Sequence, residues 1–192
     1  MRLLSLHARG RQAGPIACGL LGVAAACWTL TLLVDEPGML IPILGPLAAV
    51  SLLGFALGAA DPALERITPR RWPRWRGAEL ACSAVLAALA LLPALAQTDA
   101  DATALLRNLA GLGGLTALGV AVLGTRLAWL APANCVFLAA AIGPRDEAWI
   151  APLTWPVQPA GTGYALAIAA ALALTGALVH MRRGAATAGV LT

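Results

Sequence analysis

Long apolar segments, separated by short polar ones, run through almost the whole chain. A helix that crosses a membrane needs about 20 mostly apolar residues. Six segments reach or approach this length, at about 16–34, 39–60, 78–97, 103–124, 127–143 and 163–181. The pattern predicts an all-α fold, a polytopic transmembrane bundle of six spans. An interfacial segment at 1–15 precedes it and a tail at 182–192 follows it.

The fifth segment is the weakest of the six. It is short, it carries Pro132 and Asn134, and only Thr125 and Arg126 separate it from the fourth segment. One uninterrupted helix of about 40 residues would overrun the hydrocarbon core, so we expect the chain to turn back near Arg126. The alternative is a five-span protein in which residues 127–143 form a re-entrant segment.

The arginines indicate the orientation, because positive residues concentrate on the cytoplasmic side of a membrane protein. Six spans with both ends inside place Arg107 and Arg145 outside and eleven arginines inside. The inside set is Arg2, Arg9, Arg11, Arg66, Arg70, Arg71, Arg74, Arg76, Arg126, Arg182 and Arg183. The opposite orientation reverses this asymmetry. We therefore expect a multi-pass protein of the cell membrane with cytoplasmic N- and C-termini.

Composition supports this class and excludes others. Hydrophobic residues make up 60% of the chain and charged residues 11%, whereas soluble domains have about 25% charged residues. All basic residues other than histidine are arginines, so a phosphate-binding loop that needs lysine is excluded. The four cysteines form no C-x-x-C pair, and no cluster of polar residues resembles a catalytic site. We predict no enzyme, bound cofactor, metal or nucleic-acid partner.

The polar loop at 61–77 begins with signals for a short helix. Asp61 is a good N-cap, proline follows at the first helical position, and Glu65 lies where a negative charge meets the helix dipole favourably. One interpretation is topology and anchoring alone, since arginines and tryptophans suit anionic headgroups. The other is a surface on which a cytoplasmic partner docks, formed by Asp61, Leu64, Glu65 and Arg66.

Among the polar residues within the predicted spans, the candidates for a functional role are Arg107, Asn108 and Asn134. Arg107 lies about one turn into the fourth span, where a charge must reach water, headgroups or a partner. It either extends outward, paired with Asp101 or Asp99, or faces a central cavity or a subunit interface. Gly113 and Gly114 belong to a set of small residues that favours close helix packing in lipid.

The predicted outer loop, 144–162, contains an apolar stretch at 148–157 that is too short to span. Trp149 and Trp155 lie within it, so they are expected at the outer interface. They form a tryptophan belt, or they belong to a lid or an element that contacts substrate.

The layout resembles the membrane subunit of ABC-2-type ATP-binding-cassette exporters. A basic N-terminal stretch precedes six spans, a short helix follows the second span, and an apolar segment with tryptophans separates the last two. The stretches Leu106–Leu112 and Arg126–Pro132 look similar to small actinobacterial members. The resemblance implies a permease that forms the pathway with a second copy or a related chain, as a homodimer or heterodimer among membrane lipids.

The same resemblance implies a separate cytoplasmic ATPase, with ATP bound on that partner and the segment Asp61–Ile67 at the coupling-helix position. It also matches residues 148–157 to an outer re-entrant region. Alternatives from other classes are a non-catalytic membrane scaffold or accessory subunit and, less favoured, a secondary transporter or channel.

Overall fold

The computed structural model describes residues 13–34, 40–58, 72–96, 101–145, 147 and 149–186. Every regular element in these ranges is helical. They are α2 (Ala13–Leu33), α3 (Leu40–Ala56), α5 (Trp72–Leu95), α6 (Ala102–Leu123), α7 (Leu130–Ile142), the short 3-10 helix η1 (Trp155–Val157) and α8 (Gly163–Arg183). The all-α prediction is therefore confirmed for this part of the chain.

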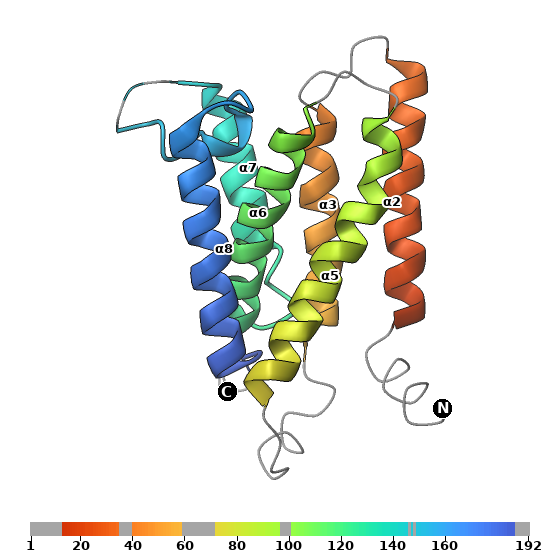
Figure 1. Cartoon of the computed structure of the whole chain (residues 1–192), viewed down its shortest axis with the longest axis vertical. Helices are drawn as coiled ribbons and strands as arrows, with labels where there is room; N and C mark the ends of the chain where they lie inside the picture. Colours follow the sequence, from red (N-terminus) through yellow and green to blue (C-terminus); the bar gives the residue numbers. More distant parts are fainter. Residues whose placement is uncertain are drawn as a thin grey trace.

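The helices run up and down as a bundle, and α2 begins at the end where α8 ends (Figure 1). We call this the basic end, because α8 finishes there with Arg182 and Arg183 and α5 starts there with Trp72–Arg76. Arg126 also lies there, directly after α6. Arg107 and Arg145 lie toward the opposite end. The described arginines are thus divided between the two ends of the bundle as the sequence predicted.

Four helices are long and apolar enough to cross a membrane: α2, α5, α6 and α8. The other two are shorter than predicted. Helix α3 has 17 residues and α7 has 13, or about 26 Å and 20 Å of helix against a hydrocarbon core of about 30 Å. These lengths show a membrane-type bundle of six described helices, four of them candidate spans.

The connection between α6 and α7 is a local break in the helix, close to the predicted position at Arg126. Gly124 follows α6 with a φ of 80°, a backbone conformation that favours glycine. Residues 125–129 form turns, and α7 starts at Leu130. The chain then folds back, and the backbone of Ala128 packs against Gly119, about one turn before the end of α6. Helix α7 therefore begins about one turn in from that end of the bundle. This explains why α7 is short.

The start of α5 differs from the sequence prediction. The third span was expected from residue 78, with a polar loop before it, but the helix already begins at Trp72. Pro73 suits a first helical turn, since the missing N–H would have no partner there. The basic stretch at 72–76 therefore continues the helix past the apolar segment.

Helix α6 is the centre of the bundle, and its most extensive contact is with α8. Gly114 and Gly176 lie where the two helices cross. A Cβ on Gly114 would overlap the backbone of Leu172, and one on Gly176 would overlap the backbone of Gly114. Glycine is thus required for this approach, as small residues are at helix crossings in lipid.

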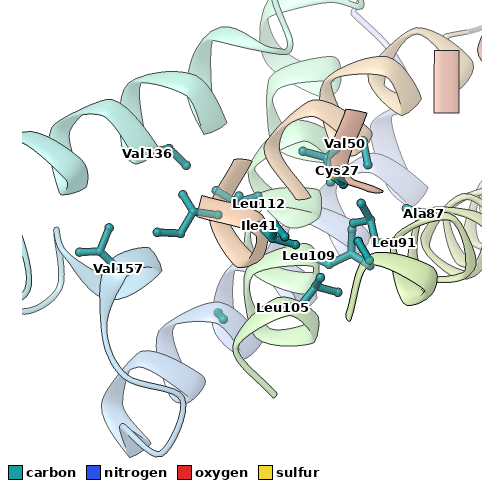
Figure 2. Packing of buried hydrophobic residues seen from close by; sticks show 14 of the residues in the cluster. Cys27, Ile41, Val50, Ala87, Leu91, Leu105, Leu109, Leu112, Val136 and Val157 are labelled. Carbon is teal, nitrogen blue, oxygen red and sulfur yellow. The ribbon is translucent and has the colours of Figure 1, made fainter. Parts of the chain in front are cut away.

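The main hydrophobic core joins α6 to α2, α3, α5, α7 and η1. Figure 2 shows Leu105, Leu109 and Leu112 of α6 among side chains from these neighbours. Val136 of α7 and Val157 of η1 extend the core toward the end of the bundle opposite the basic end. The connection between α7 and α8 is thereby packed into the bundle at that end.

Candidate functional site

The most unusual site in the described structure is a group of buried polar side chains near the start of α6. We call it the Arg107 cluster, and it consists of Arg107, Asn108, Thr154 and Gln158. Arg107 is 3% exposed and Asn108 is fully buried. Helix α6 starts at the cap residue Asp101, and Leu105 and Leu109 pack into the core. This packing places Arg107 and Asn108 inside the bundle.

The guanidinium of Arg107 donates hydrogen bonds to the α7–α8 connection. Nη1 bonds to the carbonyl oxygen of Pro159 at 2.9 Å, and Nη2 bonds to that of Gln158 at 2.8 Å and that of Pro156 at 3.4 Å. Nε bonds to Oδ1 of Asn108 at 3.2 Å. The fork of donors on arginine suits such a set of converging oxygens.

Asn108 links three parts of the chain. Its Nδ2 donates to the carbonyl oxygen of Pro42 in α3 and to that of Pro156, both at 2.9 Å. The Pro42 carbonyl lies in the first turn of α3. The carboxamide of Asn108 therefore ties α3 and α6 to η1, while its oxygen accepts from Arg107.

Gln158 and Thr154 form hydrogen bonds within the α7–α8 connection itself. Nε2 of Gln158 donates to the carbonyl oxygen of Arg145 at 2.8 Å and to Oγ1 of Thr154 at 2.9 Å. Oγ1 of Thr154 donates to the carbonyl oxygen of Ala151. Both side chains are buried. Buried polar groups in low dielectric stabilise a structure only when they are bonded, as these are.

Trp155 completes the closed end of the bundle. It is 1% exposed, and its indole lies directly against Gly111, where a Cβ would overlap the ring. Cys135 of α7 packs against the same core cluster. The segment from Thr154 to Gln158 is therefore held by apolar packing as well as by polar bonds.

The positive charge of Arg107 is balanced by neutral oxygens. The four bonded oxygens belong to three backbone carbonyls and one carboxamide. Asp101 is the one carboxylate whose charge acts on Arg107 among the described residues. Its side chain accepts from the backbone N–H of Thr103 at 2.7 Å, and this bond lowers the pKa of Asp101.

Comparisons with protein-family models, with curated proteins and with solved structures found no match for this chain.

The position of Arg107 differs from the interpretation that it extends outward. It is 3% exposed, and its four hydrogen-bond acceptors do not include the carboxylate of Asp101. Instead it lies against the backbone of the α7–α8 connection. The reason is that the apolar stretch around Trp155 folds inward, and its backbone carbonyls provide the acceptors. Asp99 lies outside the described residues.

The two tryptophans of the predicted outer interface have different environments. Trp149 is 76% exposed, whereas Trp155 is buried in the core. A tryptophan belt therefore does not describe Trp155, because Gly111 leaves room for its indole inside the bundle. Asn134 is exposed on α7. The proposed docking residues, Asp61, Leu64, Glu65 and Arg66, lie outside the described residues.

Sequence reasoning missed Thr154 and Gln158. Their four-residue spacing within an otherwise apolar stretch was a usable signal, since two polar side chains that far apart can face the same way. The described residues contain no group of three or more His, Cys, Asp or Glu that could hold a metal ion. The Arg107 cluster offers hydrogen bonds and one positive charge, and these fix a segment in place.

A small cavity of about 40 Å³ lies between α3, α5 and α6. Val50, Leu53, Leu80, Ser83 and Leu109 are among its lining residues, and the lining is almost entirely apolar. Its volume has room for a few water molecules. It lies apart from the Arg107 cluster, nearer the basic end.

Proposed function

We propose that this chain is the membrane-spanning permease subunit of an ATP-driven exporter, paired with a second copy or a related chain and with a separate ATPase. The observation that carries the proposal is the inward-folded α7–α8 connection, held by Arg107 and Asn108 at one end of the bundle. An exporter needs one end that can be closed and another on which an ATPase acts. Here the closed end and the basic end lie opposite each other (Figure 1).

The arrangement of the helices supports the proposal. The helices alternate in direction, so the connection between α3 and α5 joins helix ends at the basic end, where α8 also finishes. That connection contains Asp61, Leu64 and Glu65, the predicted docking residues. An ATPase bound there would act on α3 and α5 directly. Both helices contact α6, which carries Arg107.

The small size of the cavity between the described helices α3, α5 and α6 is the reason to include a second chain. The cavity between α3, α5 and α6 is too small for a solute, at about 40 Å³. A pathway in the proposed exporter therefore lies between subunits. Opening it requires a change in population between two packed arrangements, which ATP binding on the partner biases.

A second candidate is a non-catalytic membrane scaffold or accessory subunit. The closely packed α6–α8 crossing at Gly114 and Gly176 favours it, because a rigid core suits a protein whose work is to hold others. The two candidates differ in whether ATP hydrolysis by a partner responds to this chain.

The test is to purify the tagged full-length chain from its native membrane and to reconstitute the co-purified ATPase with and without it. We expect ATP hydrolysis to change at least several-fold on reconstitution. The double variant Leu64→Asp, Glu65→Arg should lose the ATPase while remaining folded. Trp149→Ala, an exposed change at the opposite end, is the matched control and should retain it.

One result would contradict the exporter proposal: ATP hydrolysis that is the same with and without this chain, which favours the scaffold. If the double variant instead binds and stimulates the ATPase as the unmodified chain does, the assignment of the docking segment is wrong.

A further inference from the structure

Asn134 lies on a face of α7 that no other described helix covers. Asn134, Phe137, Leu138 and Ala141 are all exposed, and Phe137 reaches 66%. Their spacing of three and four residues places them along one side of the helix. We call this side the Asn134 face. It is apolar except for one carboxamide.

The carboxamide lies about halfway along the bundle. Helix α7 packs against η1, Cys135 packs against the core cluster that contains Trp155 of η1, and Trp155 lies on Gly111. Gly111 is near the middle of α6, whose bounds are Ala102 and Leu123. Since α6 is long enough to span the hydrocarbon core, Asn134 faces outward at a depth where lipid tails surround the bundle.

Asn134 differs from the other exposed polar side chains of the spans. The hydroxyls of Thr29 and Thr175 each donate to the carbonyl four residues earlier, at 2.7 Å. A hydroxyl has one proton to donate, and this bond uses it. Asn134 makes the equivalent bond, from Nδ2 to the carbonyl oxygen of Leu130 at 2.8 Å. Its second N–H and its Oδ1 have no partner among the described residues.

Lipid tails cannot satisfy a donor and an acceptor, so the remaining amide groups are costly unless a second polar group meets them. In a second copy of this chain, Asn134 is such a polar group, with matching chemistry and at the same depth. Copies inserted in the same direction are related by an axis perpendicular to the membrane, so equal residues lie at equal depth. A carboxamide is also self-complementary, with a donor and an acceptor side by side.

We propose that two copies of this chain associate through the Asn134 face, with reciprocal hydrogen bonds from each Asn134 carboxamide to the other. Phe137 and Leu138 pack around the pair. The proposal requires a bilayer around the bundle but no ATPase, so it is tested independently of the exporter function. If that function is also correct, the pathway is bounded by α7 of both copies.

The first experiment measures dimerisation of the full-length chain in vesicles of phosphatidylcholine and phosphatidylglycerol. Donor- and acceptor-labelled copies are diluted with lipid, and energy transfer gives the dissociation constant. Asn134→Leu should weaken the dimer by about 3- to 30-fold, from the range measured for polar contacts between helices in lipid. Asn134→Gln keeps the carboxamide and should retain most of the affinity. Thr175→Val, an exposed polar-to-apolar change on α8, is the matched control.

The second experiment places the contact directly. With Cys135 replaced by alanine, Asn134→Cys should form an intermolecular disulfide under mild oxidation. Cys18 and Cys82 are exposed on α2 and α5 and serve as internal controls that should not cross-link. This measurement remains informative if Asn134→Leu fails to fold.

Dimerisation with the same constant in Asn134→Leu and the unmodified chain would overturn the proposal. So would a chain that stays monomeric at every lipid dilution, or cross-linking through Cys18 or Cys82 in place of Asn134→Cys. None of these results depends on an ATPase, so exporter coupling can succeed or fail separately.

Discussion

Helices α2 and α6 have similar lengths but opposite places in the bundle. In the stretch of each that could span a membrane, 11% of the residues of α2 are buried and 67% of those of α6. The more apolar of the two is α2, the less buried one. In a water-soluble protein the more apolar helix would be the more buried one, because apolar side chains are removed from water there. In a bilayer the peripheral helix meets lipid, and the central helix uses small and polar residues to contact its neighbours.

The largest expected effect comes from the glycine at the α6–α8 crossing. Gly114→Leu places side-chain atoms where the backbone of Leu172 lies, so we expect a loss of about 3 kcal/mol or more, or no folded protein. Gly22→Leu on α2 is the matched change, since nothing lies within 4 Å of a Cβ there. Unfolding in mixed detergent micelles, followed by tryptophan fluorescence, measures both. Equal effects of the two changes would contradict the central position of α6.

A smaller effect is expected from the buried charge on α6. Arg107→Met removes the donors to the carbonyl oxygens of Pro156, Gln158 and Pro159, and we expect a loss of about 1–3 kcal/mol. Thr29→Val on α2 removes one bond within its own helix and should change stability much less. The same unfolding assay compares them. Proteolysis within 147–162 should also become faster in Arg107→Met, and unchanged cleavage would argue against its role in holding this connection.

The smallest effect concerns the cap of α6. The bond from the N–H of Thr103 lowers the pKa of Asp101 in the folded state. The contribution of this hydrogen bond to the free energy of unfolding is therefore complete above the pKa of unfolded Asp101, about 3.9. It is lost as pH falls through the lower pKa of the folded state. The thermal midpoint of the unmodified chain should approach that of Asp101→Ala as pH falls from about 6 to below 3. A constant difference between the two across this range would contradict the assignment.

Sequence reasoning succeeded where a property depends on neighbouring residues. The apolar segments became helices, the turn after α6 lies next to Arg126, and the described arginines separate to opposite ends. It failed where partners are distant in sequence. Arg107 was expected to extend outward beside Asp101 or Asp99, or to face a cavity or a subunit interface. Three of its four acceptors are backbone carbonyl oxygens about fifty residues away. Trp149 and Trp155 were grouped together, although one faces out and the other fills space above Gly111.

By itself, the sequence determined a helical protein with long apolar segments, because helix formation and transfer into lipid depend on composition over about 20 consecutive residues. It also determined how the arginines divide between the ends of the bundle. Tertiary structure alone decided which helix is central and where the α7–α8 connection folds. Those outcomes depend on which distant backbone meets Gly114 and on carbonyl oxygens that every residue carries, so the sequence does not indicate which partners come together.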